Sequence, residues 1–129
     1  MKEMLLITQY AELTRLGVDL AKHGEEKTTA LESIQRDIES NFEEIFIILG
    51  IDADLRSASD EQIEAAIRNP DLEIGKKFEV LFLLRKGAEL QSRFNSIRDE
   101  LDRILHRLKS IQVMINVIRA QLYPNGEED

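Results

Sequence analysis

Few residues in this chain are able to carry group-transfer or metal chemistry. The sequence of 129 residues contains two histidines, His23 and His106, and no cysteine. His106 lies in the segment 101-LDRILHRLKSIQVMI-115, where leucine and isoleucine recur at helical spacing. An exposed histidine can accept a phosphoryl group or bind a metal ion. The lack of cysteine excludes disulfides, thiolate metal sites and cysteine nucleophiles.

The run 106-HRLKS-110 is similar to the His-x-Leu-Lys-Gly motif of phosphotransfer domains. In the heptad pattern of this helix His106 takes position f, which faces water. Ser110, however, replaces the glycine that lets a receiver domain approach. A phosphotransfer bundle also needs a further helix after the histidine helix, and the helical pattern ends before Pro124. We therefore expect His106 to be an ordinary surface residue.

Other chemical sites have little support. Neither histidine has a glutamate three residues before it, as the Glu-x-x-His sets of di-iron bundles require. There is no glycine-rich phosphate loop and no nucleophile elbow. The arginines of the last helix lie among acidic residues without interleaved aromatics for base stacking, and the net charge is −8. We expect no enzyme, no metal or other cofactor, and no nucleic-acid partner.

The elements that must position any site are long helices. Apolar residues alternate four and three positions apart, which predicts one helix over 3–22 and a second over 25–49. Gly24 lies between them and is interpreted as a helix end. The same alternation predicts a final helix over 72–122, with Gly87 as its plausible bend because glycine places no side chain in the apolar seam.

A short helix is predicted over 60–68, beginning with a capping box formed by Ser59 and Gln62. Two stretches flank it in the sequence, 45-IFIILGI-51 and 78-FEVLFLL-84, and both are apolar nearly all the way round. A helix needs such a composition only where partners cover it on several sides. We therefore expect the short helix to lie as a lid over both stretches.

The composition favours an all-α fold. Charged residues make up 33% of the chain, and no alternating strand pattern occurs. The expected architecture is an antiparallel helical bundle or a long helical hairpin with a short capping helix. It forms a single helical domain over 1–123, followed by an acidic disordered tail over 124–129. No apolar run is long enough for a signal peptide or a membrane span, so we expect a cytoplasmic protein without a membrane partner.

Charge differs between the two parts of the chain. Residues 1–69 carry 15 acidic and 7 basic residues, whereas residues 70–126 carry 7 and 10. This distribution is typical of helical faces that attract one another when they pack side by side.

The length of the last helix leaves two arrangements open. In a bundle of four antiparallel helices its end would overhang and expose an apolar stripe that needs a partner. In a two-helix hairpin, with 3–49 packed against 72–122, the lengths match and the stripe is core. The candidate partner-binding residues of this stripe are Ile111, Met114, Ile115, Ile118, Leu122 and Tyr123.

The segment 10-YAELTRLGVDLAKHGEEKTTALESIQRDI-38 resembles the start of FliT-like flagellar export chaperones. In that family a leucine-rich first helix ends in Leu-Ala-x-x-Gly-Glu, and residues 20–25 reproduce this junction. The segment 98-RDEL-101, followed by Gln112 and Tyr123, looks like the closing helix of the family. The related FlgN-like chaperones share the small acidic helical layout. This sequence departs from the family at Glu26, where an aromatic residue is common.

The resemblance implies a non-enzymatic cytoplasmic chaperone of bacterial flagellum biogenesis and type III protein export. Such a protein binds a protein client, holding the amphipathic terminal helix of a secreted flagellar subunit in an apolar helical groove, without nucleotide or metal. The alternative is a structural coiled-coil protein that forms a homodimer through its C-terminal helix. A histidine phosphotransfer module is the third hypothesis.

Overall fold

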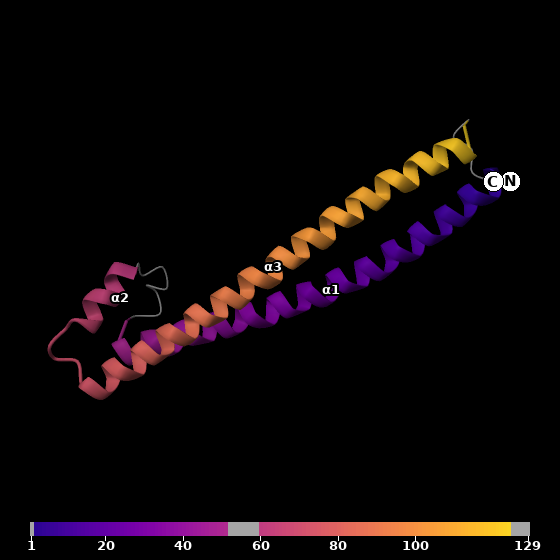
Figure 1. The fold of residues 1–129 in the computed structure, drawn as a ribbon. Coiled ribbons are helices and arrows are strands. Elements are labelled where there is room, and N and C mark those ends of the chain that lie inside the picture. Colours follow the sequence, from indigo (N-terminus) through magenta and orange to yellow (C-terminus); the bar gives the residue numbers. More distant parts are fainter. Residues whose placement is uncertain (1, 52–59, 125–129) are drawn as a thin grey trace. The chain divides into compact units, whose positions relative to one another are not determined.

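The structure, a computed structural model, describes residues 2–51 and 60–124. These described residues form helices and connecting turns and contain no strand, so the predicted all-α fold class is confirmed (Figure 1). The predicted cap residue Ser59 and tail residues 125–129 lie outside the described part of the chain. The helices are α1 (Lys2–Leu49), α2 (Asp60–Ile67) and α3 (Ile74–Leu122).

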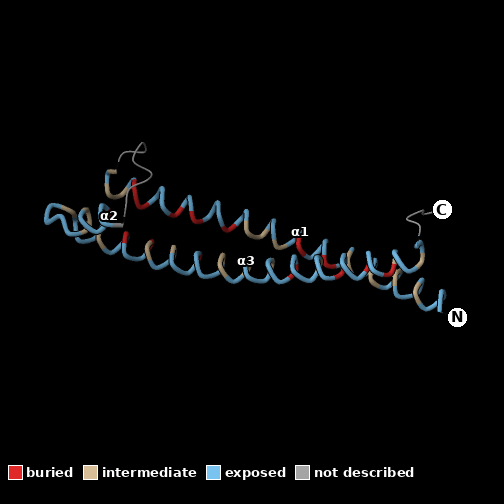
Figure 2. Tube along the Cα trace, turned by 90° about the horizontal axis from the view of Figure 1, so that it is seen from above, coloured by how far each residue is buried: buried red, intermediate tan, exposed pale blue. Residues whose placement is uncertain are grey.

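The chain divides into two compact units, which are described separately. Unit 1 consists of Met1–Ala30 and Ile97–Asp129, and unit 2 consists of Leu31–Ser96. Each unit contains one part of α1 and one part of α3, and α2 belongs to unit 2. In both units the buried positions recur along α1 and α3 with helical spacing, as the colouring of Figure 2 shows.

Helix α1 continues through Gly24, so the predicted helix end at this residue is wrong. Gly24 is buried in unit 1, and a Cβ atom there would lie 3.6 Å from Ile104 Cγ2 and 3.7 Å from Leu101 Cδ1. Both distances are ordinary van der Waals contacts, so two large side chains of α3 pack over the backbone of α1 at Gly24 and leave room for a methyl group. This packing outweighs the weak helix propensity of glycine, because tertiary contacts routinely override propensity. The four-helix alternative is therefore wrong as well, since residues 3–49 form one helix.

The core of unit 1 is a seam between antiparallel parts of α1 and α3. Gly17 lies opposite Ile111, as Gly24 lies opposite Ile104, so partner numbers fall along one helix as they rise along the other. Partly buried side chains complete the seam around the buried cluster. The buried members are Leu20, Ile104, Ile111 and Ile115, and the partly buried ones are Tyr10, Leu13 and Leu108.

Unit 2 contains the predicted lid, which is confirmed. Ile63 of α2 is 5% exposed and packs with Ile45 and Phe46 of α1 and with Val80 and Leu83 of α3. Two further residues of α2 on the same face as Ile63, Ala66 and Ile67, are half-buried. The side chains that α2 covers belong to 45–51 and 78–84, the two stretches whose apolar composition predicted a covering helix.

The turn between α2 and α3 is set by Asn69 and Pro70. The side-chain Oδ1 of Asn69 accepts a hydrogen bond from the backbone N–H of Asp71 at 3.0 Å, which forms an Asx turn. Helix α3 then begins at Ile74, two residues later than the predicted start at residue 72.

Helix α3 also continues through Gly87, and the structure shows why a glycine stands there. Asn41 of α1 is the buried polar side chain of the described core, with 4% of its surface exposed. Its Nδ2 donates a hydrogen bond to the carbonyl oxygen of Leu83 at 2.9 Å. A Cβ atom on Gly87 would lie 2.8 Å from this Nδ2. Gly87 therefore provides the space through which the Asn41 amide reaches the backbone of α3.

Alanine substitutions should separate the roles of these two glycines. Gly24→Ala adds a methyl group at ordinary contact distance, so we expect the free energy of unfolding to rise by about 0.5–1 kcal/mol through better helix propensity. Gly87→Ala displaces the Asn41 amide, so a buried amide loses its acceptor. We expect this substitution to lower the free energy of unfolding by about 1–3 kcal/mol. Urea unfolding followed by circular dichroism measures both. Equal shifts of the same sign would contradict the role assigned to Gly87.

Candidate protein-binding groove

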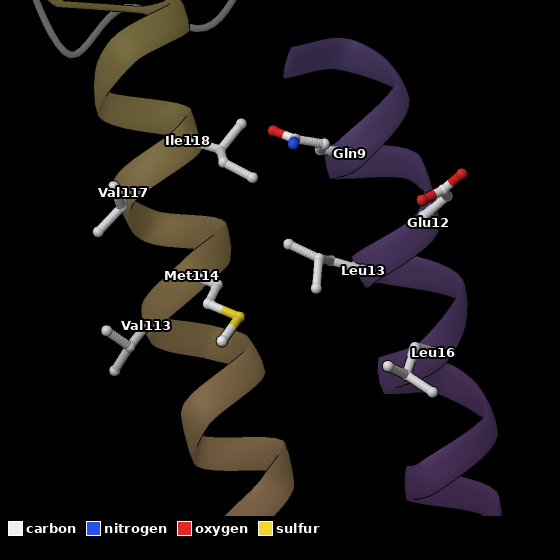
Figure 3. Close-up of a pocket in the computed structure, with 8 residues that line it drawn as sticks. All are labelled: Gln9, Glu12, Leu13, Leu16, Val113, Met114, Val117 and Ile118. Carbon is white, nitrogen blue, oxygen red and sulfur yellow. The ribbon is translucent and has the colours of Figure 1, made fainter. Parts of the chain in front are cut away.

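An apolar groove lies between α1 and α3 in unit 1 (Figure 3). Its volume is about 530 Å³, within the range of ligand-binding clefts. Each helix contributes side chains from two successive turns, spaced three or four residues apart. The lining residues are Gln9, Glu12, Leu13 and Leu16 from α1 and Val113, Met114, Val117 and Ile118 from α3.

The floor of the groove is continuous with the core of unit 1. Ile118 is 8% exposed, and Leu13 is a half-buried neighbour of the core cluster. In Figure 3 the side chains of Leu13 and Met114 point toward one another across the gap between the helices. The groove is thus a place where the seam opens toward solvent while its base remains packed.

The walls of the groove are apolar side chains that the fold leaves uncovered. The exposed fractions are 40% for Leu16, 57% for Val113, 52% for Met114 and 53% for Val117. Polar groups lie on the α1 side alone, where Gln9 and Glu12 form one edge. Contiguous apolar surface of this kind on a helical protein is typical of a binding site for another helix.

The sequence pattern explains why α3 has this second apolar face. Its buried residues follow the four-three alternation, which places Ile111, Ile115 and Ile118 against α1. Val113 and Val117 are one turn apart and lie beside that seam, so they widen the apolar surface beyond the part that one partner helix can cover. With α1 as its only partner helix in unit 1, α3 leaves these additional apolar side chains exposed to solvent.

A contact between the two helix ends lies next to the groove. Arg119 Nη2 donates a hydrogen bond to the Tyr10 hydroxyl oxygen at 2.9 Å, and the guanidinium carbon lies 5.8 Å from the centroid of the Tyr10 ring. Both groups are half-buried. Together the hydrogen bond and the cation–π contact join the α1 and α3 portions at this end of unit 1.

The structure divides the six predicted partner-binding residues into two sets. Ile111, Ile115 and Ile118 are 7–9% exposed and belong to the packed side of α3, as the hairpin alternative has it and the overhang alternative does not. Leu122 is half-buried, while Met114 and Tyr123 are exposed. The overhang alternative requires 3–22 and 25–49 to be separate short helices, whereas the continuous α1 matches α3 in length.

Three apolar wall residues of the groove, and its polar residues Gln9 and Glu12, could not be identified from the sequence pattern. Leu16, Val113 and Val117 do not fall on the four-three seam and were therefore not counted as part of an apolar surface. The available signal was the spacing of Val113 and Val117, which are four residues apart beside Met114.

The residues first considered for chemistry remain on the surface. His106 is exposed, as predicted from its heptad position. His23 Nδ1 lies 3.5 Å from Glu26 Oε2, and both side chains are 62% exposed. Among residues 2–51 and 60–124, no group of three or more histidine, aspartate or glutamate side chains is placed to hold a metal ion.

Among the described residues of unit 1, Lys27 Nζ and Glu100 Oε2 form an ion pair at 2.6 Å. The hydrogen bond from Lys27, and then its positive charge, lower the pKa of Glu100 below its ordinary value of 4.5. A lowered pKa means that the pair stabilises the fold above pH 4.5 and that this contribution is lost as pH falls through the lowered value. Since Glu100 is exposed, solvent screening keeps the contribution small.

No family model matches the chain, and comparisons with curated proteins and with solved structures find no match either. None of the helices in the described part of the chain is sufficiently long and apolar to cross a membrane. The groove and the exposed surfaces of the two units are therefore the features from which function must be inferred.

Proposed function

We propose that the protein is a helix-binding export chaperone whose client is the amphipathic terminal helix of a secreted flagellar subunit. The observation that carries this proposal is the open apolar groove of unit 1. The flagellar client class comes from the resemblance of residues 10–38 to FliT-like chaperones.

The geometry of the groove suits a third helix. Rows of apolar side chains from α1 and α3 flank a shared floor, and a helix laid between them packs against both rows at once. Residues three and four apart on the client helix would meet these rows, which is the pattern of helix-in-groove recognition. Met114 contributes a flexible, polarisable side chain that can adapt to different client residues.

The amount of uncovered surface is consistent with reversible binding. Full burial of an aliphatic side chain contributes about 1.5–3 kcal/mol, and the four wall residues are already about half covered. Covering the rest contributes about 3–6 kcal/mol from the chaperone side, before the entropic cost of association is subtracted. A client could therefore be held in the cytoplasm and released at the export apparatus without covalent chemistry or a nucleotide.

A peptide-binding measurement tests the proposal. Labelled peptides covering the terminal amphipathic helices of the filament-cap and hook-junction subunits of the same organism are titrated with the protein, and fluorescence anisotropy is recorded. We expect saturable binding to one of them. Val113→Glu with Val117→Glu should weaken it at least about tenfold, because charges replace apolar walls without entering the core.

Val18→Glu provides the matched control. Val18 is 63% exposed in the same unit and does not line the groove, so this variant should bind the peptide like the wild type. The proposal fails if no subunit peptide binds. It also fails if the two groove charges leave the affinity unchanged while circular dichroism shows that both variants are folded.

A further inference from the structure

A second apolar surface lies in unit 2, on the first three turns of α3. We name it the α3 stripe, and its members lie four, seven and eight residues after the first one, Ile74. Val80 and Leu83, which are 0% and 6% exposed, lie on the opposite side of the helix. The exposed fractions of the stripe residues are 70% for Ile74, 68% for Phe78, 50% for Leu81 and 68% for Phe82.

Two exposed phenylalanines on one helix face need a partner, because aromatic side chains carry large apolar areas. The lid helix α2 does not cover them, since its contacts are with the buried cluster on the other side of α3. We propose that the α3 stripe is the interface of a symmetric antiparallel homodimer. This inference rests on unit 2 alone and is independent of the groove in unit 1.

The charges around the stripe favour a second copy of this chain. Residues 71–89 contain four acidic and four basic residues, so two copies of the segment do not repel one another through net charge. The lack of net positive charge also removes the attraction that an anionic membrane surface would need.

The order of the charges favours antiparallel pairing. Asp71 and Glu73 precede the stripe, and Arg85 follows it one turn after the last apolar member. All three are exposed, and none of them forms an ion pair with another described residue. Reversing the direction of the second copy brings Asp71 and Glu73 of each copy beside Arg85 of the other, whereas parallel pairing would place Arg85 beside Arg85.

A two-fold axis beside Phe78 satisfies these pairings together. Phe78 then meets the Phe78 of the second copy, and Ile74 meets Phe82. Asp71 and Glu73 meet Arg85 at both ends, because a two-fold interface repeats every contact. Phenylalanine in the centre with charged residues at the rim is the usual composition of a stable interface.

Single-cysteine crosslinking tests this geometry, and the natural absence of cysteine makes it specific. Phe78→Cys places two thiols at the axis, within the Cα separation of about 4.4–6.8 Å that a disulfide needs. In Arg85→Cys each thiol lies seven residues from the axis, on opposite sides of it. At a rise of about 1.5 Å per residue, the two thiols are about 21 Å apart. On oxidation we expect Phe78→Cys to give a species of twice the 14.9 kDa chain mass and Arg85→Cys to give none.

Charge reversal tests the same arrangement without crosslinking. Light scattering should give twice the chain mass for the wild type, and Arg85→Glu should raise the dissociation constant of the dimer at least about tenfold. Adding Asp71→Lys and Glu73→Lys to Arg85→Glu should restore the dimer, because the opposite charges again face each other. Circular dichroism confirms that each variant is folded, and Val18→Glu serves as the exposed-residue control.

Several results would overturn the inference. These are a single-chain mass for the wild type at the highest concentration measured, crosslinking of both cysteine variants, or no restoration by the reversed charges. Binding of a monomeric wild type to vesicles of anionic phospholipid, abolished by Phe78→Glu, would instead assign the stripe to a membrane surface.

Discussion

The double substitution Ile115→Glu with Ile118→Glu is expected to unfold unit 1. The two isoleucines are 9% and 8% exposed, and both lie on the packed side of α3. Each substitution buries a carboxylate without a partner, which costs several kcal/mol, and two such charges exceed the stability of a typical small domain. The expected result in thermal unfolding by circular dichroism is loss of the cooperative transition and of much of the helical signal.

The groove variant Val113→Glu with Val117→Glu is the control for this prediction. It places the same number of charges on the same turns of α3, at side chains that are 57% and 53% exposed. Its melting temperature should remain close to that of the wild type, because these carboxylates stay in water. A folded and stable core variant would show that Ile115 and Ile118 are not buried in solution, and it would revive the overhang arrangement.

The second large effect is expected at the lid. Ile63→Asp should lower the free energy of unfolding of unit 2 by about 3 kcal/mol or more, since it replaces an apolar contact of the buried cluster with an unpaired charge. Amide hydrogen exchange at Val80 and Leu83 reports on this cluster, and both amides should exchange faster. Ala65→Asp puts the same charge on the exposed side of α2 and should have little effect. Similar exchange in both variants would remove α2 from the core of unit 2.

The long helices and their inward faces could be predicted from the sequence because they depend on one repeating pattern. Leucine and isoleucine recur four and three residues apart, and these positions include most of the buried residues of both units. The lid could be predicted for a related reason. A stretch that is apolar on every side must be covered on more than one side, and the short capped helix is the nearest element in the sequence.

The roles of the glycines could not be predicted, because they depend on residues far away in the chain. Gly24 resembled a helix end from its neighbours, and its actual partners are Leu101 and Ile104. Gly87 resembled a bend, and its actual partner is Asn41. Local backbone freedom explains neither position, since both glycines lie inside continuous helices, and at Gly87 the missing side chain makes room for the Asn41 amide.

The α3 stripe and the groove of unit 1 could not be predicted from the sequence, for a different reason. The stretch 78–84 is apolar on two opposite sides of α3, and the sequence does not say which side is covered. The structure shows that the side bearing Val80 and Leu83 is buried, while Phe78 and Phe82 face solvent. The groove likewise depends on how far apart α1 and α3 lie beside Met114, which no spacing along a single helix determines.

The hydrogen bond of Asn41 also bears on how unit 2 selects one alignment of its helices during folding. A four-three repeat is nearly unchanged when one helix slides by seven residues, so misaligned pairings would bury similar apolar surface. Such a slide would bring Val80 or Phe94 to the place of Gly87 opposite Asn41. A side chain would then fill the space of the amide and leave a buried polar group without its acceptor, at a cost of about 1–3 kcal/mol. One buried amide facing one glycine thus discriminates against alignments that the apolar residues alone would tolerate.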